Sequence, residues 1–355
     1  MPAGPLIIHA PNVHQGGGRT LLRSLLATTW LNTPAPAKPT HLILDTRFES
    51  VEAEIETGCP QATVHRVSPS LRARWRAERL LSQLSGPDTR ILCFAGQPPL
   101  FSCQGQVSVF VQNRNIISRT DVSNYSWKQR LRIELERLWF RTRARTATEF
   151  IVQTETMHDL LDQLLPGAAI RVRPFVPPPA DEPGPRLLPF TGKGYDFCYI
   201  ATGEPHKNHR QLIQAWCLLA RAGLFPSLCL TVGQQNSPEL HDWIEARRLD
   251  HGLKLENVGY VSAAQVEQIY GRSRRLIYPS HYESFGLPLL EALRHQLPIV
   301  AAERDYVRDV VSPEATFDPD SARSIARAVQ RVLGQASTQS RFMNPEEFLT
   351  AMFAA

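Results

Sequence analysis

The sequence lacks a long apolar run. None of its stretches approaches the ~18 consecutive apolar residues that a membrane-spanning helix needs, so we expect no segment that crosses a bilayer. The first residues also lack the basic start and extended apolar core of a signal peptide, because they lead directly into the short apolar stretch 6–9. Together these absences favour a cytoplasmic protein.

Cysteine is sparse and forms no CxxC pair. Several of the six cysteines lie inside apolar stretches, so free buried thiols in a reducing compartment are the expected state. A disulfide framework or a metal site is the alternative. The six are Cys59, Cys93, Cys103, Cys198, Cys217 and Cys229.

The length of 355 residues, 43% of them hydrophobic, indicates two domains of ordinary size. Charge is distributed unevenly between the two halves. Residues 1–180 contain 21 Lys and Arg against 14 Asp and Glu, whereas residues 181–355 contain 18 against 20. The basic first half predicts an anionic partner for that half.

Strand signals alternate with helical signals along the chain, which predicts an α/β protein whose parallel sheets are covered by helices on both faces. The expected strands are 5–10, 41–45, 63–67, 90–95, 107–112, 149–154, 196–201, 227–232, 253–258, 275–280 and 298–302, and the expected helices include 20–30, 71–84, 208–222, 239–249, 262–272 and 288–295.

A proline-rich segment divides the two series of strands. Seven of the residues from Pro174 to Pro189 are proline, which predicts a stiff, extended linker. We therefore predict two doubly wound, Rossmann-like domains, 1–175 and 191–340, that are joined by residues 176–190. Ligands of such sheets bind beyond the carboxyl ends of the strands, in a cleft.

The most informative stretch is 279–292, which reads PSHYESFGLPLLEA. Pro288 stands where a first helical residue is expected, so Glu283 belongs to a strand-to-helix loop and Glu291 to the first turns of the helix. Gly286 lets the backbone approach a ligand, and the unpaired amides of a helix start bind anions. Two carboxylates around an anion-binding turn suit a sugar nucleotide, which has hydroxyl groups at both ends and phosphate in the middle. An ordinary helix start with an exposed glutamate is the alternative.

The Glu-x7-Glu pattern with its FGLPLLEA core resembles the donor-site signature of family 4 (group 1) retaining glycosyltransferases. The resemblance spans most of the chain and is most specific from 199 to 320. It implies the GT-B fold, in which two Rossmann-like domains face each other across a cleft. It also implies that the tail, 341–355, can return to the first domain.

The resemblance assigns a role to each glutamate. Glu283 corresponds to the carboxylate that holds hydroxyls of the donor hexose in the catalytic centre. Glu291 corresponds to the carboxylate that accepts both ribose hydroxyls, a geometry that suits a carboxylate. The backbone between them is expected to contact sugar and phosphate, and it comprises Ser284, Phe285, Gly286 and Leu287.

The second series of strands opens with ATGEPHKN, where the resembled family has Gly-Arg-x4-Lys-Asn. Lys207 and Asn208 match, and a cation at a helix start is unfavourable unless an anion lies there, so Lys207 is expected to bind the donor diphosphate. A solvated lysine is the alternative. Asn208 and Thr202 are expected as further donor contacts. Thr202 replaces the arginine, and its hydroxyl cannot substitute for a charged bidentate group. Either Lys207 and the helix amides bind more of the phosphate, or His206 or Arg210 helps.

Three consecutive glycines follow the first predicted strand. Gly16, Gly17 and Gly18 predict a loop that can approach a phosphate or a sugar without Cβ clashes, or a turn that needs positive φ. The resemblance implies that this loop faces the donor diphosphate and the acceptor.

The His-Asp pair that many relatives carry near the acceptor is missing. The strand 107–112 leads instead into Gln112-Asn113-Arg114, whose amides cannot transfer a proton. The resemblance implies that the leaving diphosphate takes the acceptor proton. Asn113 is a candidate sugar contact in the catalytic centre and Arg114 a candidate acceptor or phosphate contact, with a packed strand end as the alternative for both. This segment resembles a bacterial branch that builds surface polysaccharides, such as O-antigen or capsule.

We expect no metal ion and no cofactor besides the nucleotide-sugar substrate. No DxD-like motif precedes the donor site, and Asp318 and Asp320 fit a turn and a helix cap. The sequence does not distinguish UDP, GDP and ADP sugars, because backbone and shape recognise the base.

Residues 127–145 mix aromatic residues and leucines with seven Lys and Arg. Such a helix can lie on an anionic membrane surface, which would suit a lipid-linked acceptor at the inner leaflet. It can equally be a domain helix with one buried face and one solvated basic face. We expect no nucleic-acid partner.

The sequence thus predicts a retaining hexosyltransferase that acts on a glycan or lipid-linked glycan in lipopolysaccharide, O-antigen or capsule assembly. A catalytically degenerate GT-B protein that binds sugar nucleotide or a partner subunit is one alternative, favoured by Thr202 and the missing His-Asp pair. A GT-B sugar-nucleotide epimerase is the other. Retention of Glu283, Glu291 and Lys207 counts against degeneracy.

Overall fold

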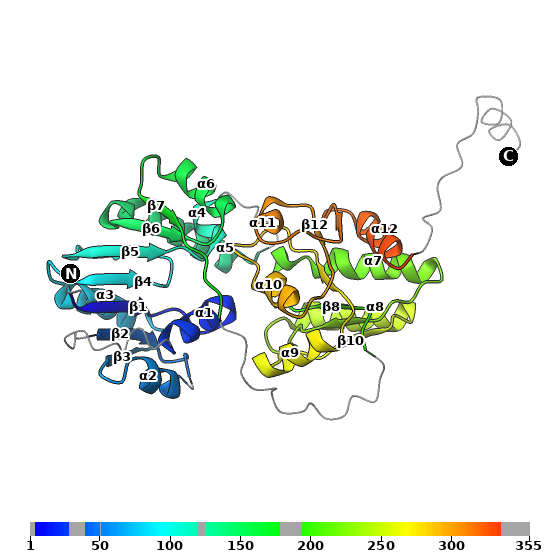
Figure 1. Ribbon diagram of the computed structural model, residues 1–355, viewed down its shortest axis with the longest axis horizontal. Helices are drawn as coiled ribbons and strands as arrows, with labels where there is room; N and C mark the ends of the chain where they lie inside the picture. The colour runs from blue at the N-terminus through cyan, green and yellow to red at the C-terminus, as the bar shows by residue number, and fades with distance from the viewer. Residues whose placement is uncertain (1–3, 28–39, 50, 119–124, 178–193, 335–355) are drawn as a thin grey trace, which may run out of the picture.

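Two parallel sheets lie beside each other, each with helices on both faces (Figure 1). The computed structural model describes residues 4–27, 40–49, 51–118, 125–177 and 194–334. Most of the predicted linker, 176–190, and the whole predicted tail, 341–355, lie outside the described residues.

The first sheet contains β1 (Leu6–Ala10), β2 (Thr40–Asp45), β3 (Thr63–Val67), β4 (Arg90–Cys93), β5 (Gln106–Phe110), β6 (Glu149–Val152) and β7 (Ile170–Val172). Its helices are α1 (Gly16–Leu26), α2 (Glu52–Gly58), α3 (Leu71–Leu84), α4 (Arg114–Ile117), α5 (Trp127–Arg143), the 3-10 turn η2 (Ala144–Thr146) and α6 (Glu155–Leu164). The strand order is β3-β2-β1-β4-β5-β6-β7. Successive β1 residues Ile7 and Ile8 belong to separate apolar clusters, as expected for a sheet buried on both faces.

The second sheet contains β8 (Phe197–Tyr199), β9 (Leu228–Leu230), β10 (Leu255–Asn257), β11 (Leu276–Tyr278), β12 (Ile299–Ala302) and β13 (Ala315–Phe317). Its helices are the 3-10 turn η3 (Pro205–Lys207), α7 (His209–Arg221), α8 (Pro238–His251), α9 (Ala263–Gly271), α10 (Leu287–Arg294), α11 (Asp305–Arg308) and α12 (Ala322–Val332). The strand order is β10-β9-β8-β11-β12-β13. The order reverses between β8 and β11, and a crevice opens at such a reversal in a doubly wound sheet.

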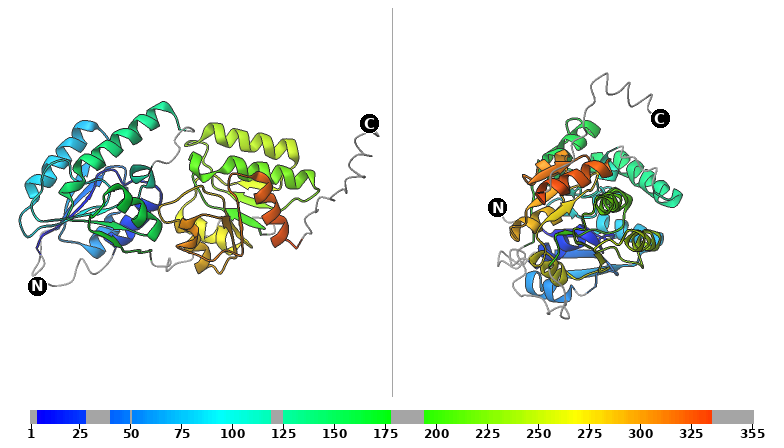
Figure 2. Two further views of the ribbon diagram at one scale, coloured as in Figure 1. Left: turned by 90° about the horizontal axis from the view of Figure 1, so that it is seen from above. Right: turned by 90° about the vertical axis from the view of Figure 1, so that its right-hand side faces the viewer.

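The two sheets meet through the loops at their carboxyl ends. The Thr156 amide donates to Asp309 Oδ2 at 2.9 Å, and Thr154 Oγ1 donates to the Ser284 carbonyl at 3.4 Å. Both views of Figure 2 place α3, α5, α7 and α8 on one side of the molecule. The two domains therefore share a seam beside the reversal of the second sheet.

The predicted α/β organisation is confirmed, with one correction at the glycines. The helix expected over 20–30 begins at Gly16, so Gly17 and Gly18 lie in the first turn of α1 instead of a preceding loop. Gly16 has a φ of 63°, as the alternative of a turn with positive φ predicted. The elements α2, α6, β7, β13 and α12 were not among those predicted. The six cysteines are free thiols, as expected.

Candidate active site

An ion pair lies at the strand reversal of the second sheet. Lys207 follows β8 and Glu283 follows β11, the neighbouring strand across the reversal. Lys207 Nζ lies 2.8 Å from Glu283 Oε1 and 2.9 Å from Oε2. The two side chains are only 17% and 10% exposed. The structure thus brings together Lys207 and Glu283, two of the three residues that the sequence predicted at the catalytic centre; Asn113 is the third.

The Glu283 carboxylate is held in its ionised form. Burial opposes the charge, but the Lys207 ammonium next to it outweighs this effect and lowers the pKa of Glu283 below its ordinary value. The Tyr278 hydroxyl also donates to Oε1 at 3.1 Å. A buried, ionised carboxylate can accept further hydrogen bonds from the hydroxyl groups of a sugar.

Asn208 fixes the backbone next to Lys207. It adopts a left-handed conformation with φ of 62°, and its Nδ2 donates to the Pro279 carbonyl at 3.1 Å and the Pro319 carbonyl at 2.7 Å. These carbonyls follow β11 and β13, and Asn208 itself lies in the loop after β8. One side chain therefore connects three loops. We predicted Asn208 as a donor contact; in the structure its amide group binds the backbone and positions Lys207.

Three buried tyrosines donate hydrogen bonds to the ion pair or to the backbone near it. Tyr199 OH donates to the Lys207 carbonyl at 2.8 Å and lies 2.9 Å from Ser280 Oγ. Tyr306 OH donates to the Ser280 carbonyl at 2.8 Å, and Tyr278 OH binds Glu283. The sequence interpretation missed these hydroxyls because their residues lie in apolar strand signals or a short helix, where a tyrosine also fits as a core residue.

The loop after Glu283 brings its backbone close to the start of α10. Gly286 has φ of 83°, and a Cβ there would lie 3.0 Å from Leu289 Cδ1. Phe285 is buried, and Leu287 opens the helix. One turn further, Glu291 Oε2 accepts a hydrogen bond from Tyr270 OH at 2.9 Å, and burial raises the pKa of Glu291.

The first turn of α1 lies against α10 from the other domain. A Cβ on Gly17 would lie 3.1 Å from Leu287 Cδ1, and a Cβ on Gly18 would lie 3.1 Å from Gln112 Oε1. The chain therefore needs glycine at this close approach. The three glycines lie at the donor-loop side of the first domain, although they are helical.

Two first-domain candidates follow β5. Asn113 caps α4, since its Oδ1 accepts from the Asn115 amide at 3.0 Å, which leaves its Nδ2 group and one lone pair of Oδ1 for a sugar. Arg114 reaches across the seam and places its guanidinium carbon 5.5 Å from the ring centre of Tyr282. Its Nε is buried without a hydrogen-bond partner among the described residues, and burial lowers the pKa of Arg114.

Aromatic side chains of both domains meet next to Lys207. The rings of His206 and Tyr282 stack with centres 4.8 Å apart, and Tyr125 OH of the first domain lies 3.0 Å from His206 Nδ1. Burial, reinforced by Lys207, lowers the pKa of His206 to about 4. His206 is therefore neutral near pH 7 and supplies no positive charge to a phosphate.

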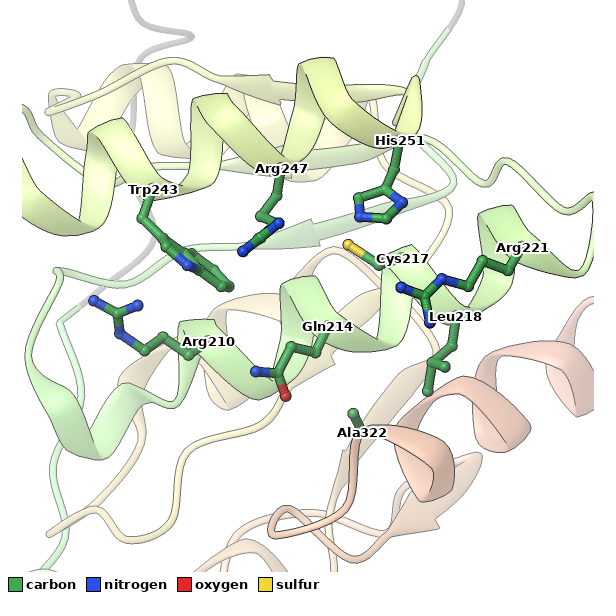
Figure 3. A pocket seen from close by; sticks show the side chains of 9 residues that line it. All are labelled: Arg210, Gln214, Cys217, Leu218, Arg221, Trp243, Arg247, His251 and Ala322. Atoms are coloured by element: carbon green, nitrogen blue, oxygen red, sulfur yellow. The ribbon is translucent and has the colours of Figure 1, made fainter.

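The structure also shows where Thr202, which replaces the family arginine, and Arg210, which could compensate for it, are located. Thr202 is exposed and its hydroxyl donates to the Glu204 carboxylate. Arg210, expected as a substitute, stacks 4.8 Å over the Trp243 ring and lines a cavity between α7 and α8 (Figure 3). The guanidinium of Arg114, from the opposite domain, lies beside the donor loop, over the ring of Tyr282.

Within the described ranges, no three His, Cys, Asp or Glu side chains are grouped so that they could hold a metal ion. Asp318 and Asp320 form a turn, because the Asp320 amide donates to Asp318 Oδ1 at 3.0 Å.

Solved structures share the whole architecture at low sequence identity. HepE from Anabaena, crystallised with UDP and glucose, aligns over 93% of this chain and 90% of its own with a TM-score of 0.64 and 13% identity. The lipopolysaccharide outer core galactosyltransferase WaaB aligns over 99% of both chains with a TM-score of 0.57 and 15% identity. The fold is therefore that of the GT-B glycosyltransferases, with two Rossmann-like domains.

The sequence comparison is more specific for the second domain. Residues 186–345 match the family model described as glycosyl transferases group 1. O-antigen chain mannosyltransferase B of Escherichia coli is 30% identical over 142 residues. That alignment covers 40% of this chain and 37% of the relative, so the chain matches well under half of the relative's length.

The ion pair makes stability depend on pH. Because the pKa of Glu283 is lowered by folding, its contribution is complete above the unfolded value and is lost as the pH falls through the folded value. We expect Glu283→Gln to lower the free energy of unfolding by roughly 3 kcal/mol at about pH 7, and by less at a pH below the unfolded-state pKa of a glutamate. Urea unfolding at the two pH values measures this, and an equal loss at both would contradict the account.

Asn208→Gly keeps the left-handed backbone but removes both side-chain hydrogen bonds. We expect a loss of roughly 1–3 kcal/mol in unfolding free energy together with weaker nucleotide binding, since Lys207 is no longer held. Asn257→Gly is the matched control, because the Asn257 amide bridges the Val232 backbone away from the site. If both variants destabilised the protein and bound nucleotide equally well, Asn208 would have no role in the site.

Proposed function

We propose that the protein is a family 4 retaining glycosyltransferase that moves a hexose from a nucleotide diphosphate sugar to a glycan or lipid-linked glycan acceptor. The observation that carries this proposal is the Lys207–Glu283 ion pair at the strand reversal, beside the Gly286 turn that opens α10. Donor phosphate would meet Lys207, Arg114 and the first amides of α10. The hexose hydroxyls would meet Glu283, and the ribose hydroxyls Glu291.

The reaction breaks the bond between the anomeric carbon and the diphosphate oxygen, and forms one between that carbon and the acceptor oxygen. Negative charge develops on the diphosphate, so preorganised cations there lower the barrier. The acceptor proton passes to the leaving diphosphate on the same face of the sugar. This route requires no protein base, consistent with the amides at Gln112 and Asn113, and we propose that it requires no metal ion.

The proposed pathway is the assembly of a bacterial surface polysaccharide, either lipopolysaccharide O-antigen or capsule. It is supported by the relative named O-antigen chain mannosyltransferase B and by the likeness to WaaB. HepE was solved with UDP, but a UDP, GDP or ADP sugar each remains a candidate donor here. We propose a cytoplasmic location for the reaction.

Incubation with donor sugar alone separates the alternatives. A transferase hydrolyses its donor slowly and releases nucleoside diphosphate, and an acceptor accelerates this release. An epimerase changes a stereocentre of the sugar without any acceptor. A degenerate GT-B protein binds the donor and turns over nothing.

Glu283→Gln should lower kcat by about two orders of magnitude and change nucleotide affinity only a few-fold, because the carboxylate acts on the hexose as its bond breaks. Steady-state release of nucleoside diphosphate measures kcat, and calorimetry measures affinity. Glu256→Gln is the matched control, since Glu256 accepts from Tyr195 OH at 2.7 Å elsewhere in the same domain. Equal turnover by the two variants would remove Glu283 from the catalytic centre.

We further propose that α3 and α5 contact an anionic membrane. No helix in the described part of the chain is long and apolar enough to cross a bilayer. On α5, however, a stripe of large apolar side chains is exposed, with Trp127 at 69%, Leu131 at 54%, Leu135 at 57% and Leu138 at 59%. The same helix carries six Lys and Arg against two Glu.

Neighbouring α3 extends this surface. Leu71 is 86% exposed and Trp75 46%, and with Arg72 and Arg76 they line a second cavity of about 460 Å³. α3 carries four Arg and one Glu. Apolar side chains interleaved with cations are the composition of a surface that inserts shallowly among anionic lipids.

Leu135→Gln/Leu138→Gln should weaken co-flotation with phosphatidylglycerol vesicles by about tenfold or more. The reason is that two exposed leucines, which would be buried among the lipids on membrane contact, are lost. Val64→Thr/Leu293→Gln is the control, since it also removes partly exposed apolar side chains but from other elements. Equal flotation by both variants, or none by the wild type, would contradict membrane contact. Donor turnover in detergent tests the transferase proposal separately.

A further inference from the structure

The second domain carries a concave surface whose lining includes neither Lys207 nor Glu283. A cavity of about 450 Å³ opens between α7, α8 and the first residue of α12, Ala322. Figure 3 shows Arg221 of α7 and Arg247 of α8 extending into it. None of the residues that line the cavity is Asp or Glu.

Three of the residues that line this cavity are arginines: Arg210, Arg221 and Arg247. Burial raises the pKa of the Cys217 thiol in the lining, and the positive charges of Arg247 and Arg221 offset this rise only in part. Arg247 and Arg210 lie 5.7 Å and 4.8 Å from the ring centre of Trp243. The indole therefore holds two of the arginines in place.

Little in the protein neutralises this charge. Arg247 Nη1 lies 3.4 Å from Asp250 Oδ2, at the exposed rim. Neither Arg210 nor Arg221 has a carboxylate within ion-pair distance among the described residues. A group of guanidinium ions around one cavity, with one weak carboxylate contact, favours an anion that several forked donors can bind together.

We infer that the cavity between α7, α8 and α12 is a binding site for a phosphate or diphosphate group. The planar donors of Arg221 and Arg247 would grip its oxygens from two helices, with His251 at the rim. The site is separate from the donor site, where Lys207 and Glu283 lie. The inference does not depend on the proposed transferase activity.

Two sources could supply such a group. One is a soluble phosphorylated molecule. The other is the headgroup of a lipid, because α7 and α8 lie on the same side of the molecule as α3 and α5 (Figure 2). A protein resting on a bilayer through α3 and α5 would turn this cavity toward the lipid phosphates.

Calorimetric titration with inorganic pyrophosphate tests the site itself. The donor site is intact in every protein compared, so any pyrophosphate that it binds is common to all of them. Arg221→Gln/Arg247→Gln should weaken or abolish one binding event by about tenfold or more, since charged hydrogen bonds are lost. Arg327→Gln/Arg331→Gln removes equal charge from α12 outside the cavity and should bind like the wild type. Identical binding by all three proteins, or no binding by any, would overturn the inference; thermal unfolding verifies that each is folded.

Vesicle flotation then identifies the source of the phosphate. If lipid supplies it, Arg221→Gln/Arg247→Gln floats less with phosphatidylglycerol vesicles than Arg327→Gln/Arg331→Gln does. If a soluble molecule supplies it, the two variants float equally while only the cavity variant loses pyrophosphate. Either flotation result supports the site provided that the cavity variant has lost pyrophosphate binding, since unchanged pyrophosphate binding by itself excludes the site.

Discussion

The candidate site depends on one buried ion pair. Lys207 and Glu283 join the loops that follow β8 and β11, the two strands between which the second sheet reverses its order. Neither charge is stable alone at such a depth, because a buried ion without its partner costs several kcal/mol (about 3–5). The surrounding hydrogen bonds from Tyr278 and Asn208 hold the pair in place, so the geometry exists before any ligand arrives.

The site is completed only where the two domains meet. Arg114 and Tyr125 come from the first domain, and they contact Tyr282 and His206 of the second. Gly17 allows α1 to approach Leu287. Under the proposed function, the donor site would be shared by two domains, and closing motions that exclude water are general in two-domain enzymes.

The sequence predicted the alternation of strands and helices because apolar periodicity and glycine or proline at the ends reflect local rules. It also selected Glu283, Glu291 and Lys207 as candidates, because their charges stand out at strand ends and helix starts. The structure places Lys207 against Glu283, and the donor-binding roles of all three stay predictions. It could not predict that Asn208 binds two backbone carbonyls or that Arg210 faces Trp243. Those outcomes depend on side-chain direction, which follows from the packing of distant loops. The tyrosines Tyr199 and Tyr278 were missed because a buried tyrosine in a strand usually signals only the core.

The central claim is that the second domain holds a nucleoside diphosphate with Glu291 on its ribose. Calorimetric titration of UDP, GDP and ADP into the wild type and Glu291→Ala tests it most directly. We expect one of these nucleotides to bind the wild type and to lose roughly 1.5–3 kcal/mol of binding free energy in the variant, the value of charge-assisted hydrogen bonds. Equal affinity for both proteins, or no binding to the folded wild type, would contradict the account.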